Sequence, residues 1–249
     1  MGCVLSLGRR GRIDGVHIAY VAVCAAIVII TAFIPMFPVI GVGATMSAGM
    51  IIVPLVGIML GPTAGTLATA VGAFLGQIVA PYGAIFGLIT FLCPLASTAT
   101  AAFLSRRKWK QGGLLVLMGI LLWYLTTGIM WAGNPKAGIM WYFPFLHILS
   151  LVLVLVFRGK IGEWIASMDP KRMSIGIFLA SLAGTLTEHM VGNSIYIGIY
   201  RGPPGPFYFV ITIYWIERVL AAVGATVVGT PLLIGLKKAR IDIGPWASE

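Results

Sequence analysis

Charged residues are scarce in this sequence. Asp, Glu, Lys and Arg make up 10% of the 249 residues, whereas 59% are hydrophobic, and the mean hydropathy is +1.00. Soluble domains carry roughly 25% charged residues. This shortage excludes an ordinary soluble domain. It predicts an all-α membrane protein, a polytopic helical bundle that forms a single integral membrane domain over residues 1–249.

Acidic residues are the scarcest charged type. Seven Asp and Glu face 17 Lys and Arg, which gives a net charge of +10. Such an excess would suggest nucleic acid in a soluble protein, but here the basic residues cluster between apolar runs, as in the cytoplasmic loops of membrane proteins. We therefore expect the lipid bilayer of the cell membrane, and no nucleic acid, as a partner.

Several chemical motifs are also missing. Cys3, Cys24 and Cys93 have no paired or metal-like spacing, which argues against a disulfide framework and a zinc site. The chain has no Gly-x-x-x-x-Gly-Lys-Ser/Thr phosphate loop, no His-Glu-x-x-His and no Gly-x-Ser-x-Gly. His17 and His147 stand alone, and each is expected to be a structural or interface histidine. We expect no catalytic residue, metal or cofactor, and ATP-driven transport would need a separate ATPase.

Apolar runs of near-spanning length fill most of the chain. A membrane-spanning helix needs ~20 residues, and eight segments approach this length. They are 16–34, 44–60, 63–80, 84–104, 113–132, 138–157, 173–199 and 208–236. Segments 44–60 and 63–80 are short, and a re-entrant pair there would leave six crossings. The sequence thus predicts six to eight transmembrane helices.

Basic clusters separate these segments in even numbers. They lie at 9–12, 106–110, 158–172 and 237–240. All four can face the cytoplasm together, which predicts cytoplasmic termini with short basic tails at 1–15 and 237–249. Apolar residues at helical spacing within the third cluster predict an amphipathic helix on the cytoplasmic surface.

Small residues recur in the stretch 41–83. Gly57, Gly61 and Gly65, and then Gly72 and Gly76, are four residues apart, so they form smooth stripes on helix faces. Such stripes let helix backbones approach closely in lipid. We expect a tightly packed hairpin that folds at Leu60-Gly61-Pro62.

Ionisable residues within the last two apolar segments are functional candidates, because charge in a membrane is costly. At ~1.5 Å per residue, the polar groups of both segments lie at similar depth. Two interpretations stay open, an ion pair that joins two helices and a polar pocket for a solute, and the surplus of amide and aromatic groups favours the pocket. The candidate residues are Glu188, His189, Asn193, Tyr196, Tyr214, Glu217 and Arg218.

The segment Pro54-Leu-Val-Gly-Ile-Met-Leu-Gly-Pro-Thr-Ala-Gly65 resembles a hairpin motif of the substrate-binding (S) components of energy-coupling factor transporters. Glu217-Arg218 followed by Gly229-Thr-Pro-Leu232 is also similar to the final helix of that family. The resemblance implies uptake of a vitamin or related micronutrient, bound from the outer side under the loop 35–47. It further implies a separate transmembrane coupling subunit, docked on the small residues Ala22 and Ala26, and ATPase subunits. The substrate stays open, and an autonomous small-solute permease or channel and, less favoured, an intramembrane enzyme are the alternatives.

Overall fold

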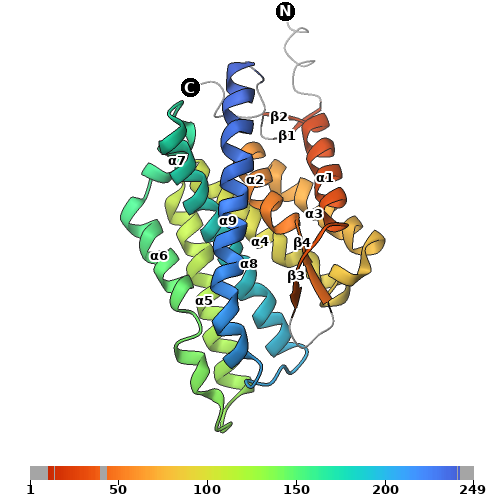
Figure 1. Cartoon of the computed structure of the whole chain (residues 1–249), viewed down its shortest axis with the longest axis vertical. Helices are drawn as coiled ribbons and strands as arrows, with labels where there is room; N and C mark the ends of the chain where they lie inside the picture. The colour runs from red at the N-terminus through yellow and green to blue at the C-terminus, as the bar shows by residue number, and fades with distance from the viewer. Residues whose placement is uncertain (1–10, 14, 40–43, 240, 242–249) are drawn as a thin grey trace, which may run out of the picture.

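The computed structural model describes residues 11–13, 15–39, 44–239 and 241. In Figure 1, α1 and α3 form one flank of a helical bundle, α5 and α6 form the other, and α4, α8 and α9 run between them. The elements in chain order are β1 (Arg12–Ile13), β2 (Val16–His17), α1 (Ile18–Ala32), β3 (Pro35–Val39), β4 (Ala44–Ser47), α2 (Gly49–Leu60), α3 (Pro62–Val79), the 3-10 helices η1 (Pro81–Gly83) and η2 (Gly87–Phe91), α4 (Leu92–Ser105), α5 (Trp109–Met130), η3 (Ala137–Trp141), α6 (Phe145–Phe157), α7 (Lys160–Ala166), α8 (Pro170–Gly198) and α9 (Phe207–Lys238).

Six helical segments of the described chain are long and apolar enough to cross a membrane. They are α3, η2 with α4, α5, η3 with α6, α8 and α9. This confirms the predicted all-α, multi-pass membrane protein. The helices α1 and α2 have only 15 and 12 residues. At ~1.5 Å per residue, neither reaches across a hydrocarbon core ~30 Å thick.

A β-hairpin extends these two short helices. β3 follows α1 and pairs antiparallel with β4, which leads into α2. The prediction of one helix over 44–60 is therefore wrong at its start, because residues 44–47 form a strand. Backbone groups need internal partners inside a membrane, and the strand pairing supplies them where the helices end. Residues 40–43, at the tip of the predicted covering loop, lie outside the described residues.

The predicted turn between α2 and α3 is confirmed. Gly61 has φ +85°, a conformation that favours glycine, and Pro62 is the first residue of α3, where its missing N–H costs nothing. Arg106 Nη2, at the end of α4, donates a hydrogen bond to the Met59 carbonyl at 3.1 Å. Burial lowers the pKa of Arg106 to about 10, which leaves it charged near neutral pH. The turn therefore lies beside the basic residues that follow α4.

The small-residue stripes make the close contacts expected of them. A Cβ on Gly57 would lie 2.2 Å from the Thr98 carbonyl oxygen, and one on Gly72 would lie 2.7 Å from the Ala25 carbonyl oxygen. α2 therefore packs directly on α4, and α3 packs on α1. Thr98 Oγ1 also donates to the Val53 carbonyl at 3.0 Å, which ties α4 to α2.

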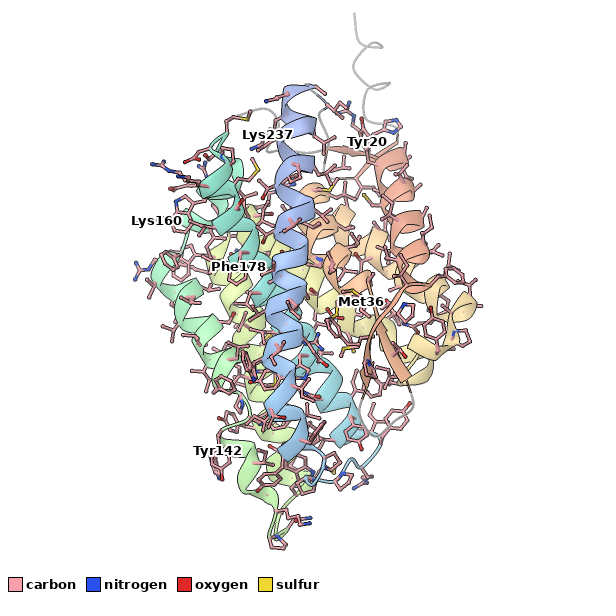
Figure 2. The ribbon with its side chains drawn as sticks, viewed as in Figure 1. Tyr20, Met36, Tyr142, Lys160, Phe178 and Lys237 are labelled. Atoms are coloured by element: carbon pink, nitrogen blue, oxygen red, sulfur yellow. The ribbon has the colours of Figure 1, made fainter. Side chains whose placement is uncertain are left out.

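Both ends of the described chain lie at the same end of the bundle. Figure 1 places the β1–β2 pair beside the last turns of α9, and Figure 2 shows Tyr20 and Lys237 there, with Tyr142 at the opposite end. Leu236 packs against the cluster that contains Val16. Arg9, Arg10, Arg240 and most of both predicted tails lie outside the described residues, and the cytoplasmic position of this end stays a prediction.

The predicted surface helix within 158–172 is shorter and more deeply packed than expected. α7 covers Lys160–Ala166, and its Ile161 and Ile165 are buried in the main core cluster rather than turned toward lipid. Lys237 Nζ, at the end of α9, donates to the carbonyls of Ile165 and Ala166 at 3.1 and 2.7 Å. The apolar face of α7 therefore closes the basic end of the bundle.

The Gly57 contact gives a test of the packing. Gly57→Ala should lower the free energy of unfolding by ~1–3 kcal/mol, the usual cost of overpacking, because the new methyl group meets a backbone carbonyl rather than a movable side chain. Gly128→Ala in α5 is the matched control. A Cβ there has no neighbour within 4 Å, so the change should be neutral or slightly stabilising. Thermal unfolding in detergent measures both, and equal effects would contradict the packing.

Candidate functional site

A cavity of about 240 Å³ lies inside the bundle. This volume is slightly below the usual range of ~300–1,000 Å³ for small-molecule sites. The structure brings all seven sequence-predicted polar residues to its wall. They are Glu188, His189, Asn193 and Tyr196 from α8, and Tyr214, Glu217 and Arg218 from α9.

The antiparallel pairing of α8 and α9 sets the depth of these groups. Glu188 is ten residues before the end of α8 at Gly198, and Glu217 is ten residues after the start of α9 at Phe207. At ~1.5 Å per residue, both lie about 15 Å from the connection between the two helices. The two carboxylates thus sit at a similar depth, as the sequence predicts.

Arg218 is buried without an acidic partner in contact. Its side chain is 3% exposed, and Nη2 donates to the Met46 sulfur at 3.0 Å. A thioether is a weak acceptor. Arg218 Nε has no hydrogen-bond partner, and no carboxylate oxygen of the described residues lies within 4.0 Å of the guanidinium. The bonded ion pair required by the helix-joining interpretation is therefore not formed in the described chain.

Further polar atoms on the cavity wall also lack partners. Glu188 Oε2 and Asn193 Nδ2 are both buried without a hydrogen bond. Buried polar groups in proteins nearly always have a partner, either protein or ordered water. Glu188, Asn193 and Arg218 also line one cavity, so a polar molecule within it would meet three polar side chains on the wall.

Stacked rings form part of the wall. His189 Nδ1 lies 3.3 Å from His147 Nε2, and the Tyr214 ring stacks on both imidazoles, with centroids 4.9 and 5.4 Å away. The Tyr214 hydroxyl donates to the Phe143 carbonyl at 2.8 Å. Tyr214 therefore offers the cavity its ring rather than its hydroxyl. His147, which looks isolated in the sequence, is the structural partner of His189.

The opposite wall comes from residues that sequence reasoning did not single out. Gln77 of α3, Thr90 of η2, Cys93 of α4 and Met46 of β4 line the cavity. Gln77 is the only amide side chain in α3, which was an available signal. The others resemble ordinary core residues, and only the packing of their elements identifies them.

The predicted covering loop 35–47 lies at the cavity, whereas the predicted docking residues lie on the other side of α1. Within 35–47, the described residues Pro38, Thr45, Met46 and Ser47 line the cavity. Ala22 and Ala26 instead lie on the exposed face of α1. The other face of α1 contributes Val28 and Ala32 to the cavity, so this helix separates the two features.

Comparisons with known proteins give one relative and no family. No protein-family model matches the chain, and no solved structure matches it. The chain is similar to an uncharacterized protein of Methanocaldococcus jannaschii, with 29% identity over 193 residues. The match covers 77% of this chain and 62% of that protein, so the chain spans less than two thirds of its relative's length.

The substitution Arg218→Met distinguishes a polar pocket from a helix-joining ion pair. Without ligand, this variant should unfold within ~1 kcal/mol of the wild type, whereas breaking a bonded buried pair costs ~3–5 kcal/mol. Arg106→Met is the control, because Arg106 donates to the Met59 carbonyl. Its loss should cost ~1.5–3 kcal/mol, as for other hydrogen bonds from charged groups. Thermal unfolding of the ligand-free protein measures both, and a larger loss for Arg218→Met would restore the structural interpretation.

Proposed function

We propose that this multi-pass membrane protein is a substrate-binding subunit for the uptake of a small, vitamin-like micronutrient. It works with a separate transmembrane coupling subunit and ATPase subunits, as the S components of energy-coupling factor transporters do. The observation that carries the proposal is the cavity, whose wall brings together Glu188, Asn193 and Arg218, three buried polar side chains that each have an atom without a hydrogen-bond partner. In this proposal the basic end of the bundle faces the cytoplasm.

The packing beyond the cavity favours binding over free conduction. From Arg218 toward the basic end, the facing parts of α8 and α9 contain small residues with no exposed surface. They are Ala180, Ala183, Ala221, Ala222 and Ala225. Toward the opposite end, the lining continues to Pro206 at the start of α9. A solute held beside Arg218 therefore meets closely packed side chains without exposed surface on its way to the basic end.

The surface of α1 supports a requirement for a partner. Ala22 and Ala26 share an exposed face with Val23, Ile27 and Ile30. Small residues allow close helix contact in lipid. A coupling subunit docked there would touch the helix that also supplies Val28 and Ala32 to the cavity. Partner binding and solute binding would then act on opposite faces of one short helix.

Asn193→Ala and Tyr196→Phe test the pocket without leaving a protein charge unpaired. Each should weaken binding of the native solute by ~0.5–1.5 kcal/mol, the usual worth of one hydrogen bond. Native mass spectrometry of the purified protein identifies the co-purifying molecule and measures its occupancy. The matched controls are Asn134→Ala and Tyr208→Phe, which remove the same groups away from the cavity. Wild-type occupancy in both site variants would place the pocket elsewhere.

Transport by the purified chain distinguishes the proposal from an autonomous permease. In liposomes, the chain alone should bind the solute identified by mass spectrometry but should not accumulate it against a gradient. Membrane vesicles from the native host, where partners are present, should accumulate it only with ATP. Uphill accumulation by the purified chain would instead favour the permease.

A further inference from the structure

The cavity wall carries charges of both signs. Among its described lining residues, Arg218 is the single Lys or Arg side chain, and Glu188 and Glu217 are the carboxylates. Neither carboxylate lies within 4.0 Å of the Arg218 guanidinium in the described chain. The separation leaves room for a molecule between the guanidinium and the carboxylates, since polar groups this far apart commonly share an intervening partner.

A ligand of one charge would satisfy only part of this wall. A simple anion would pair with Arg218 but would face two carboxylates. A simple cation would pair with a carboxylate but would leave the buried Arg218 guanidinium with the Met46 sulfur as its hydrogen-bond acceptor. Charged side chains within membranes pair with opposite charge, so the arrangement favours a ligand that provides both.

We infer that the cavity binds a small zwitterion, an inference that rests on the proposed substrate-binding function. Its carboxylate occupies the fork of the Arg218 guanidinium, the side chain best suited to bidentate recognition of a planar anion. Its protonated nitrogen lies between Glu188 and Glu217. The three charged side chains thus set the separation of the two ionic groups on the ligand.

The remaining lining of the cavity indicates the size and polarity of the uncharged part of this molecule. Rings of Phe86, Tyr196, Phe207 and Tyr214 line it, and aromatic faces favour apolar groups and nearby cations. With a volume of about 240 Å³, the cavity suits a compact molecule. We therefore expect an apolar or aromatic body that joins a carboxylate to a basic nitrogen.

Three probes with a shared phenyl body test the charge requirement. They are phenylalanine, which carries both charges, 3-phenylpropanoate, which lacks the nitrogen, and phenethylamine, which lacks the carboxylate. Isothermal titration calorimetry on the full chain in detergent should give a Kd for phenylalanine about tenfold or more below either other value, because each incomplete probe leaves a buried charge unpaired. Equal or tighter binding of either incomplete probe would overturn the inference.

Two variants assign the charges. Glu188→Gln combined with Glu217→Gln should remove the preference for phenylalanine over 3-phenylpropanoate, and Arg218→Gln should remove the preference over phenethylamine. Retention of both preferences would contradict the assigned roles. If a variant does not fold, the comparison of the three probes on the wild-type protein still decides the charge requirement.

If none of the three probes binds, the identity of the co-purifying molecule tests the inference instead. Native mass spectrometry with fragmentation should then find a molecule that contains both a carboxylate and a basic nitrogen. A bound molecule without one of these groups would overturn the zwitterion and leave the proposed function standing. No bound molecule, together with no binding of any probe, would indicate a water-filled cavity and would overturn the proposed function itself.

Discussion

Two glycine contacts on α4 hold the walls of the cavity in place. A Cβ on Gly57 of α2 would lie 2.2 Å from the Thr98 carbonyl oxygen, and one on Gly184 of α8 would lie 2.8 Å from that of Ser97. Adjacent carbonyls of one helix therefore fix helices on both sides. Glu188 follows Gly184 by one helical turn, and α4 itself lines the cavity one turn before Ser97. Added bulk at either contact would move a wall of the site.

The features that the sequence predicts best are those whose misplacement in lipid would cost free energy. Charged side chains inside apolar segments stand out because a membrane-facing position would penalise them, and this alone identifies Glu188, Glu217 and Arg218 as interior groups. Their equal distance from a shared turn then places them at one depth. The turn at Gly61 is equally predictable, since glycine followed by proline ends one helix and begins another. Much of one cavity wall and one tight hairpin could therefore be predicted without coordinates.

The β3–β4 hairpin and the neutral residues of the cavity wall depend on tertiary packing, which cannot be read from the sequence. Segment 44–60 is uncharged and mostly apolar and looks like one helix, yet 44–47 pair with the strand Pro35–Val39. Two prolines in that strand argue against a sheet at the level of sequence. Met46 and Cys93 resemble core residues until the hairpin and α4 bring them to the cavity. Their neutral side chains carry no membrane penalty, so nothing in the sequence distinguishes them.

The same packing limits how a bound solute could cross the membrane. A route through the bundle would have to separate α8 from α9 where Ala183 and Ala222 have no exposed surface and where Ser174 Oγ lies 3.0 Å from Thr230 Oγ1. Closely packed interiors resist such opening, because each lost contact leaves an unfilled space. Reorientation of the whole bundle keeps these contacts intact, but it moves apolar surface relative to the bilayer. In the proposed function, the coupling partner would supply the work for that motion.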